Sequence, residues 1–533
     1  MSYKVLVTDS LSEKGLAILR SCEEIELDLS LGLSPEDLTE KIKGYDAILI
    51  RSGTKLTEAI LSSADNLKVI GRAGVGVDNV DVDFASYKGI IVMNAPSGNT
   101  LSTAELTISM LLALARKIPQ ANASMKAKKW DRKGFVGVEL FGKTLGIVGF
   151  GRIGREVAQR MKSFGMKVLA YDPYASLNIA NSLGVSLTTD LNDIYAESDF
   201  ITLHTPLTKE TKHLIDKESL SKMKKNVAII NCARGGLVDE EALADSIKSG
   251  HVTGAAFDAY SSEPLQADHP FYDLDSVIMT PHVGASTKEA QENVAIDVAN
   301  QLVDMLVSKK IKNAVNYVQV APEVFEKIEP FMGLATCLGT FLSYLKKGCY
   351  SHLKLSFFGE LAELDVSCLT TNVIKSLLKP ILHDSINDVN AHWMAKDRGL
   401  AVETEKKAHS ESFSALMRVT LCCDDGSEIS VAGTTFGKNN IRIVRIDEHH
   451  VDVEPNGYVL VCKNIDKPGF VGRIGTILGE NDINIANMTL GRKEKGSHAV
   501  TVFNVDEIVS QEILEKISSL DDIVQVSFVN FEG

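Results

Sequence analysis

Three polar residues follow the ends of consecutive predicted strands, where their side chains can face one cleft: Arg234, Glu263 and His282. A guanidinium binds a substrate carboxylate and polarises a C–O bond, an imidazole accepts a hydroxyl proton, and a carboxylate tunes that imidazole. Beside a nicotinamide, these groups supply what hydride transfer from a 2-hydroxy acid requires. Taken singly, each has a structural interpretation: a surface cation, a solvated loop acid, and a capping or packed histidine. Their order and their places at strand ends favour catalysis.

A glycine-rich turn at residues 145–154, Leu-Gly-Ile-Val-Gly-Phe-Gly-Arg-Ile-Gly, predicts the cofactor. Gly149 suits a tight turn, Gly151 lets a pyrophosphate approach the backbone, and Gly154 lets the next helix pack on the strand. The pyrophosphate then binds at the helix N-terminus, where free N–H groups favour anions. Asp172 ends the next predicted strand, where a carboxylate accepts the ribose hydroxyls of NAD and repels the 2′-phosphate of NADP. The sequence therefore predicts NAD binding; the alternative is a purely structural turn.

The order of the predicted elements indicates how these residues are positioned. Apolar strands and amphipathic helices alternate over the first hundred residues, which is typical of a small parallel α/β domain. Long helical stretches at 102–128 and 288–309 bracket the nucleotide-binding segment, as they would if it were inserted into the first domain. We expect the active site in the cleft between the two domains. Predicted strands are 4–8, 25–29, 47–50, 68–71 and 90–93, then 167–171, 200–204, 228–231, 254–258 and 277–280.

The pattern changes after residue 315, and no nucleotide motif follows. Strands are predicted at 351–357, 414–422 and 427–434, with a hairpin at 440–447 and 449–454. Residues 457–533 then have the order strand, helix, strand, strand, helix, strand, which is a ferredoxin-like unit.

Size and composition limit the class of protein. A chain of 533 residues is too long for one core and predicts three or four domains. A net charge of −14 without a dense basic stretch disfavours nucleic acid or an anionic membrane as a partner. No apolar run is expected to span a bilayer, and the N-terminus enters a strand at once, so we expect no signal peptide. The eight scattered cysteines have no zinc-ligand spacing, which predicts no metal site and a cytoplasmic location.

Over about residues 1–315 the chain resembles the D-isomer-specific 2-hydroxyacid dehydrogenases, and within them the phosphoglycerate dehydrogenases. The resemblance implies NAD-dependent oxidation of 3-phospho-D-glycerate to 3-phosphohydroxypyruvate, the first step of L-serine biosynthesis. The strings that carry it, besides the glycine turn and the catalytic set, are Ile50–Gly53, Gly71–Asn79, Trp130–Lys133 and Pro281–Ala290.

The same resemblance implies roles for individual residues. It assigns Arg234 to the substrate carboxylate, His282 to acid–base catalysis and Glu263 to His282, whose pKa a neighbouring carboxylate should raise. Val75 is a departure, because relatives often have a polar threonine near the nicotinamide. The positions implied around the cofactor are Val75, Gly149, Gly151, Arg152, Ile153, Gly154, Asp172, Thr205, Cys232, Ala233, Arg234, Asp258, His282, Gly284 and Ala285.

A phosphorylated substrate needs cations besides the one that binds its carboxylate. Arg51, Arg72 and Arg132 are the candidates, since a guanidinium fork matches phosphate oxygens; the alternative is three ordinary surface arginines. The resemblance also places Ser52 and Asn99 at the substrate.

The C-terminal unit resembles an ACT domain, a module that binds small amino acids at a dimer interface. Asn464, Asp466 and Asn484 match positions that hold serine in relatives, which implies L-serine as a candidate effector and a homotetramer. The alternative is a domain that only dimerises. The segment before it weakly resembles the intervening domain of long phosphoglycerate dehydrogenases.

We therefore expect a Rossmann domain (99–281) inserted in a flavodoxin-like substrate domain (1–98 and 282–314). An α+β intervening domain for regulation and oligomerisation (315–453) and a ferredoxin-like ACT domain (456–533) follow. Two other functions remain open. One is a D-2-hydroxyacid dehydrogenase for 2-hydroxyglutarate or hydroxypyruvate and glyoxylate, which would not need the three arginines together. The other is an NAD-sensing, corepressor-like scaffold.

Overall fold

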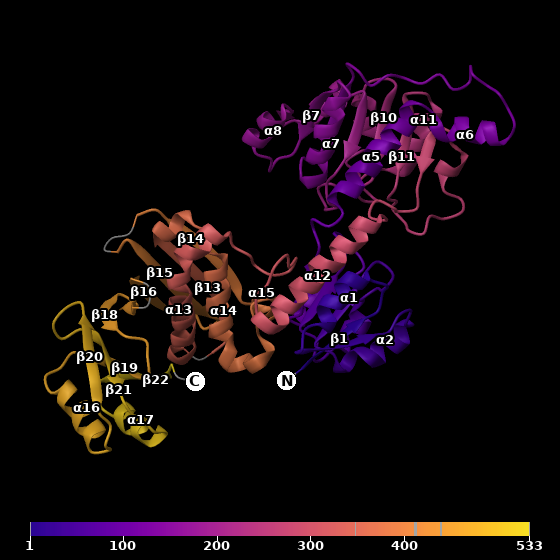
Figure 1. The fold of residues 1–533 in the computed structure, drawn as a ribbon. Coiled ribbons are helices and arrows are strands. Elements are labelled where there is room, and N and C mark those ends of the chain that lie inside the picture. The colour runs from indigo at the N-terminus through magenta and orange to yellow at the C-terminus, as the bar shows by residue number, and fades with distance from the viewer. Residues whose placement is uncertain (1, 347, 410–412, 438–439, 532–533) are drawn as a thin grey trace. The chain divides into compact units, whose positions relative to one another are not determined.

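Four β-sheets organise the chain (Figure 1). The computed structural model describes residues 2–346, 348–409, 413–437 and 440–531. Each sheet lies within one of the four predicted domains, whose boundaries themselves stay predictions. By its internal contacts the chain divides into two compact units, one drawn mainly from residues up to Asn313 and the other mainly from the residues after it.

The first sheet has the strand order β2-β1-β3-β4-β5, the flavodoxin-like order that we expected. The registers of β1 with β2 and β3, and of β3 with β4, are parallel. Its middle strand, β3 (Ala47–Ile50), is wholly apolar and buried, as in sheets covered on both faces. The elements are β1 (Tyr3–Val7), α1 (Glu13–Arg20), β2 (Ile25–Leu29), α2 (Pro35–Lys41), β3 (Ala47–Ile50), α3 (Glu58–Ser62), β4 (Val69–Arg72), α4 (Val82–Tyr87) and β5 (Ile91–Asn94).

Helix α12 (Lys288–Ser308) returns the chain to this first sheet, as predicted. It runs beside α1 in Figure 1, and the Nζ atom of Lys14 on α1 lies 2.6 Å from Oε2 of Glu292 on α12. Thr287 caps the helix, because its Oγ1 accepts the backbone N–H of Ala290 at 3.1 Å. The nucleotide-binding segment is therefore inserted between two parts of the first domain.

The second sheet has the order β12-β11-β10-β9-β6-β7-β8, with parallel registers throughout, which confirms the Rossmann prediction. The order reverses between β6 and β9, and folds of this class bind ligands at that switch point. The elements are β6 (Thr144–Val148), α7 (Arg152–Ser163), β7 (Lys167–Tyr171), α8 (Leu177–Leu183), β8 (Ser186–Thr188), α9 (Leu191–Glu197), β9 (Phe200–Leu203), α10 (Lys217–Lys222), β10 (Val227–Asn231), α11 (Glu240–Lys248), β11 (Val252–Phe257) and β12 (Val277–Met279).

The single helical stretch predicted at 102–128 is two helices, α5 (Thr100–Ala115) and α6 (Ile118–Lys126). Lys117 between them has a φ of 50°, and Pro119 lies in the first turn of α6. A left-handed residue cannot continue an α-helix, and proline lacks the N–H that would extend the hydrogen bonding. The helix therefore breaks at Lys117.

The third sheet has the order β14-β13-β15-β16-β17-β18 and is antiparallel except for the parallel pair β13–β14. Residues of α13 and α14 share a buried core with one face of this sheet, which confirms an α+β unit. The elements are α13 (Pro322–Leu345), β13 (Tyr350–Gly359), α14 (Ser367–Leu382), α15 (Ala391–Asp397), β14 (Ala401–Lys407), β15 (Ala415–Cys423), β16 (Glu428–Phe436), β17 (Asn440–Ile446) and β18 (His449–Val453).

Helix α13 corrects the expectation that no apolar run reaches membrane-spanning length. Among the described residues it is the one helix whose length and composition would suit a span. Its Leu334, Leu338, Phe341 and Leu342 are fully buried in the core that it shares with the third sheet. Packing in that core accounts for its apolar composition.

The fourth sheet has the order β20-β21-β19-β22, and the element order confirms the ferredoxin-like prediction. The elements are β19 (Tyr458–Ile465), α16 (Phe470–Gly479), β20 (Ile485–Arg492), β21 (His498–Val505), α17 (Gln511–Ser518) and β22 (Ile523–Asn530).

Candidate active site

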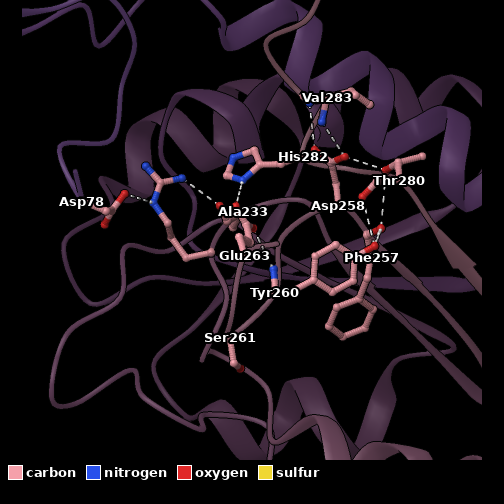
Figure 2. Close-up of polar contacts among 12 residues, drawn as sticks. Asp78, Ala233, Phe257, Asp258, Tyr260, Ser261, Glu263, Thr280, His282 and Val283 are labelled. Atoms are coloured by element: carbon pink, nitrogen blue, oxygen red, sulfur yellow. Dashed lines mark hydrogen bonds and ion pairs between the residues drawn. The ribbon is translucent and has the colours of Figure 1, made fainter. Parts of the chain in front are cut away.

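His282 and Glu263 form a hydrogen-bonded pair (Figure 2). His282 follows β12, Glu263 follows β11, and His282 Nδ1 lies 2.7 Å from Glu263 Oε2. The other carboxylate oxygen, Oε1, accepts the backbone N–H of Tyr260 at 3.0 Å, which fixes the orientation of the carboxylate. Because a carboxylate accepts from Nδ1–H, Nε2 is the ring nitrogen left to take a substrate proton.

Each partner shifts the pKa of the other toward the charged pair. The hydrogen bond to Glu263 raises the pKa of His282 and outweighs burial, which acts in the opposite direction. Burial raises the pKa of Glu263, but the hydrogen bonds from His282 and Tyr260 outweigh it, so that pKa is lowered overall. The pair therefore stabilises the imidazolium that forms when His282 accepts a proton.

Glu263→Gln should move the acidic limb of the kcat/KM profile for alcohol oxidation to lower pH. Oxidation needs a neutral imidazole, and the carboxylate raises the pKa of His282, so its removal keeps His282 neutral at a lower pH. The measurement is the pH dependence of kcat/KM for both proteins. Glu241→Gln, on the first turn of α11, is the matched control and should leave the limb in place. An unmoved limb in Glu263→Gln would separate the two residues functionally.

Asp258 holds the loop that carries His282. Its Oδ1 accepts from Thr280 Oγ1 at 2.6 Å and from the Val283 N–H at 2.8 Å, while Oδ2 accepts the Gly284 N–H at 2.8 Å (Figure 2). Asp258 is only 1% exposed, and His282 adopts a φ of 53°. An unusual backbone conformation persists where its surroundings fix it, as these three bonds do. The predicted cofactor contact of Asp258 stays a prediction, but its carboxylate is directed into this loop.

Asn231, which sequence reasoning missed, fixes the loop of Arg234. Its Nδ2 donates to the Arg234 carbonyl at 2.9 Å and its Oδ1 accepts the Ala233 N–H at 3.1 Å. The signal was available, since an asparagine that ends a strand often closes such a turn. Arg234 Nε then lies 3.4 Å from Oδ2 of Asp78, a second residue that was missed. A Cβ on Gly76 would overlap Nη2 of Arg234, so a side chain there would displace the guanidinium.

Two further arginines approach Arg234. Burial, together with the positive charges of Arg234 and Arg51, lowers the pKa of Arg72 to about 10 against the opposing effects of Asp78 and Asp9. The Nε of Arg72 is buried without a hydrogen-bond partner among the described residues. The Arg51 guanidinium donates one hydrogen bond, from Nη1 to the Ser10 carbonyl oxygen at 3.2 Å. Three cations thus lie close together, an arrangement that an anion would stabilise.

The structure does not bring all the predicted substrate residues into this group. Arg132 is exposed on the loop between α6 and β6 and has no hydrogen bond or ion pair within the described residues. Ser52 is exposed next to Arg51. Asn99 precedes α5, and its Oδ1 is buried without a partner in the described part of the chain, so it can still accept from a ligand.

The glycine loop has the geometry that a dinucleotide requires. Gly149 has a φ of 96°, and a Cβ there would lie 2.5 Å from the carbonyl oxygen of His204. A Cβ on Gly154 would overlap the carbonyl oxygen of Gly149, so glycine lets α7 pack against the loop. Apart from chain neighbours, no described atom lies within 4 Å of a Cβ at Gly151. The N-terminus of α7 is therefore open to a pyrophosphate.

Asp172 lies against this loop. Its Oδ2 accepts the Phe150 N–H at 2.9 Å and its Oδ1 accepts the Tyr174 N–H at 2.9 Å, which orients the carboxylate and leaves lone pairs for ribose hydroxyls. Thr205 Oγ1 is buried with no partner in the described chain, which suits a ligand hydrogen bond. The residues present therefore fit NAD.

The other predicted cofactor positions differ in what their side chains do. The Cys232 thiol belongs to the core, since its Sγ lies 3.5 Å from Met110 Sδ and burial raises its pKa to about 12. Only its backbone can face a cofactor. The backbone carbonyl of Val75 accepts a hydrogen bond from Asn94 Nδ2 at 2.6 Å. The remaining positions lie at the start of α7 (Arg152, Ile153) and in the loops after β10 and β12 (Ala233, Gly284, Ala285).

Asp172 should make NAD the preferred cofactor over NADP by tenfold or more in kcat/KM. The carboxylate gains hydrogen bonds to ribose hydroxyls worth about 1.5–3 kcal/mol, and it repels a 2′-phosphate. The measurement is kcat/KM with each cofactor for the native enzyme and for Asp172→Ala. The exposed Asp193→Ala on α9 is a matched control. Equal efficiency of the native enzyme with both cofactors would contradict this role.

The predicted effector residues fall at opposite ends of the fourth sheet. Asn464 on β19 pairs with Ala499 at the start of β21, whereas β20, which follows Asn484, begins opposite Val505 at the end of β21. At about 3.4 Å per residue, the two ends are about 20 Å apart within one chain. One chain therefore does not bring the three predicted residues together.

These residues also have partners within the chain. Asn464 is fully buried and accepts from Thr501 Oγ1 at 2.9 Å. Asp466 forms an ion pair with Arg492, which lowers the pKa of its carboxyl. The amide of Asn484 donates to Asp506 Oδ2 at 2.7 Å.

Three protein-family models match successive parts of the chain. They are the "D-isomer specific 2-hydroxyacid dehydrogenase, NAD binding domain" over residues 108–284, the "D-3-phosphoglycerate dehydrogenase intervening domain" over 327–447, and the "ACT domain" over 458–522.

Known proteins match the chain over its full length or over its dehydrogenase part. D-3-phosphoglycerate dehydrogenase of Methanocaldococcus jannaschii is 44% identical over 99% of both chains, and that of Archaeoglobus fulgidus is 43% identical over 99% of both. The solved structure of D-lactate dehydrogenase from Aquifex aeolicus, complexed with NAD and lactic acid, is 31% identical. It covers 57% of this chain and 96% of its own, with a TM-score of 0.51.

Proposed function

We propose that this chain, a member of the D-3-phosphoglycerate dehydrogenase family, oxidises 3-phospho-D-glycerate to 3-phosphohydroxypyruvate with NAD. This reaction is the first step of L-serine biosynthesis. The observation that carries the proposal is the convergence of Arg51, Arg72 and Arg234, two of them without a carboxylate ion pair in the described chain. A substrate with a carboxylate and a phosphate supplies the anions that these cations lack.

The residues divide the reaction among them. The Arg234 guanidinium binds the substrate carboxylate, which takes the place of Asp78 in the ion pair. His282 Nε2 accepts the proton of the C2 hydroxyl, and Glu263 stabilises the imidazolium through Nδ1. Bound NAD supplies the acceptor for the C2 hydride. Asp258 keeps the His282 loop in place, so the imidazole is positioned before substrate binds.

We assign the phosphate to Arg51 and Arg72 and leave Arg132 outside the set. The Nε of Arg72 is buried and unpaired within the described chain, whereas Arg132 is exposed and has no hydrogen bond or ion pair there. The test is a steady-state comparison of 3-phosphoglycerate with 2-hydroxyglutarate and glyoxylate as substrates. The runner-up, a dehydrogenase for those unphosphorylated acids, predicts no preference for the phosphorylated one. A scaffold without catalysis predicts no turnover of any.

We also propose that L-serine is an effector and that the enzyme is a cytoplasmic homotetramer. Because Asp466 and Asn484 lie at opposite ends of one sheet, a serine site that uses both requires the ACT domain of a second chain. The Asp466 carboxylate would bind the serine ammonium in place of Arg492.

Asp466→Ala should weaken inhibition by L-serine roughly ten- to a hundredfold, since a charge-assisted hydrogen bond contributes about 1.5–3 kcal/mol. The measurement is the inhibition constant at fixed 3-phosphoglycerate, with Asp521→Ala, after α17, as the control in the same domain. Inhibition of equal strength in Asp466→Ala would exclude this carboxylate. A full-length protein that binds no serine would leave the ACT domain with an assembly role only.

A further inference from the structure

The third sheet has a cavity of about 570 Å³ on the face that its two long helices do not cover. Along β13 and β15, Phe357, Met417 and Val419 are buried with α13 and α14. Successive side chains of a strand alternate between faces, so Phe358 and Arg418 lie on the other face. Both line the cavity. It is therefore separate from the core and far along the chain from every residue of the proposed active site.

Cations dominate the polar lining of this cavity. Lys407, Arg418 and Arg445 line it together with His409, and the residues that line it include no described aspartate or glutamate. Lys407 Nζ and Arg418 Cζ lie 5.7 Å and 5.4 Å from the centre of the Phe358 ring. Cation–π contacts of this kind orient a cation without neutralising it. Lys407 also forms an ion pair with Glu405, with Nζ 3.0 Å from Oε1, whereas Arg418 has no ion pair with a carboxylate within the described chain.

The strand register sets the spacing of the two arginines. Arg418 on β15 pairs with Ala432 on β16, and Ala432 in turn pairs with Arg445 on β17. The two arginines are thus two strands apart, at a backbone separation of about 10 Å. The residue between them has only a methyl group, which leaves room above the sheet. Two long side chains at this spacing can reach one anionic group from opposite sides.

We propose that this cavity binds an organic anion, in which a carboxylate or phosphate is attached to an apolar or aromatic body. Arg418 and Arg445 would bind the anionic group, and Phe358, Phe413 and Leu416 would contact the apolar body. The volume lies in the range of small-molecule sites and exceeds what an inorganic ion fills. The aromatic wall selects for a ring or a branched chain.

The experiment is calorimetry on the full-length protein with phenyl phosphate and benzoate as probes and inorganic phosphate as the ion-only comparison. Both aromatic anions should bind more tightly than inorganic phosphate, and the affinity should fall as NaCl is raised. Arg418→Gln should weaken the aromatic probes about tenfold or more. Arg398→Gln, at the end of α15 in the same domain, should bind as the native protein does. Arg72→Gln should retain this binding, because it changes only the proposed catalytic phosphate site.

Three results would overturn the proposal. The first is equal affinity of the native protein and Arg418→Gln for both aromatic probes. The second is inorganic phosphate binding as tightly as phenyl phosphate, which would show that the apolar walls contribute nothing. The third is a changed oligomeric state of Arg418→Gln by analytical ultracentrifugation, which would assign the cavity to an interface between chains. Unchanged NAD affinity of Arg418→Gln serves as the check that the variant is folded.

Discussion

His282→Ala should lower kcat by roughly 10²–10⁴, because the group that accepts the hydroxyl proton is removed. The affinity for NAD should change little, since the glycine loop and Asp172 lie in other segments. The measurements are the steady-state turnover of 3-phosphoglycerate and the Kd of NAD. Together they separate a lost base from a misfolded site.

The matched control for this variant is His251→Ala. His251 precedes β11 and bonds through Nε2 to the Leu220 carbonyl at 3.0 Å, so its role is structural. Its loss should leave turnover largely intact. Wild-type turnover in His282→Ala would mean that His282 also has only a structural role, and the proposed mechanism would fail.

Arg72→Gln should lower kcat/KM for 3-phosphoglycerate by roughly 10²-fold or more. Each charge-assisted hydrogen bond to a phosphate contributes about 1.5–3 kcal/mol, and a guanidinium fork can make two. The loss should be specific to the phosphorylated substrate, so residual activity with D-glycerate should be nearly unchanged. Arg72→Lys keeps the charge without the fork and should recover part of the activity.

Arg132→Gln is the matched control for Arg72→Gln, because Arg132 is exposed and has no hydrogen bond or ion pair within the described chain. It should change kcat/KM for 3-phosphoglycerate by much less. An equal loss of kcat/KM in both variants would indicate that Arg132 also binds the substrate. An equal loss with D-glycerate in Arg72→Gln would mean that Arg72 supports the fold of the loop and does not bind phosphate.

The parts of the site that follow from local sterics are predicted well from the sequence. Gly149 and Gly154 are required by contacts with neighbouring backbone, and Asp172 lies next to the loop that they form. The His282–Glu263 hydrogen bond is also present as expected. The glycine turn and Asp172 belong to one strand–turn–helix–strand segment, whereas the His282–Glu263 bond joins the loops after two neighbouring strands and was expected from the family resemblance.

Relations between distant segments could not be predicted in this way. The ion pair of Asp78 with Arg234 and the bonds of Asp258 to the His282 loop depend on tertiary structure. The separation of Asn464 from Asn484 follows only from the strand order of the fourth sheet. Each required knowledge of which strands are neighbours.

Two misses concern helices. The break at Lys117 had a local signal, Pro119, which a continuous apolar pattern obscured. Only strands are predicted between residues 316 and 452, whereas the structure adds α13, α14 and α15 there. Helices α13 and α14 pack against each other and against the sheet. Apolar residues therefore occupy more than one face of each helix. That distribution weakens the helical periodicity on which sequence reasoning depends.

The central claim is that this chain oxidises 3-phosphoglycerate with NAD. The most direct measurement is the ratio of kcat/KM for 3-phosphoglycerate to that for D-2-hydroxyglutarate, with NAD and with the phosphorylated keto acid product identified. A binding site with two additional arginines predicts a ratio of about 10² or more in favour of 3-phosphoglycerate. A ratio near one, or turnover of 2-hydroxyglutarate alone, would contradict the claim.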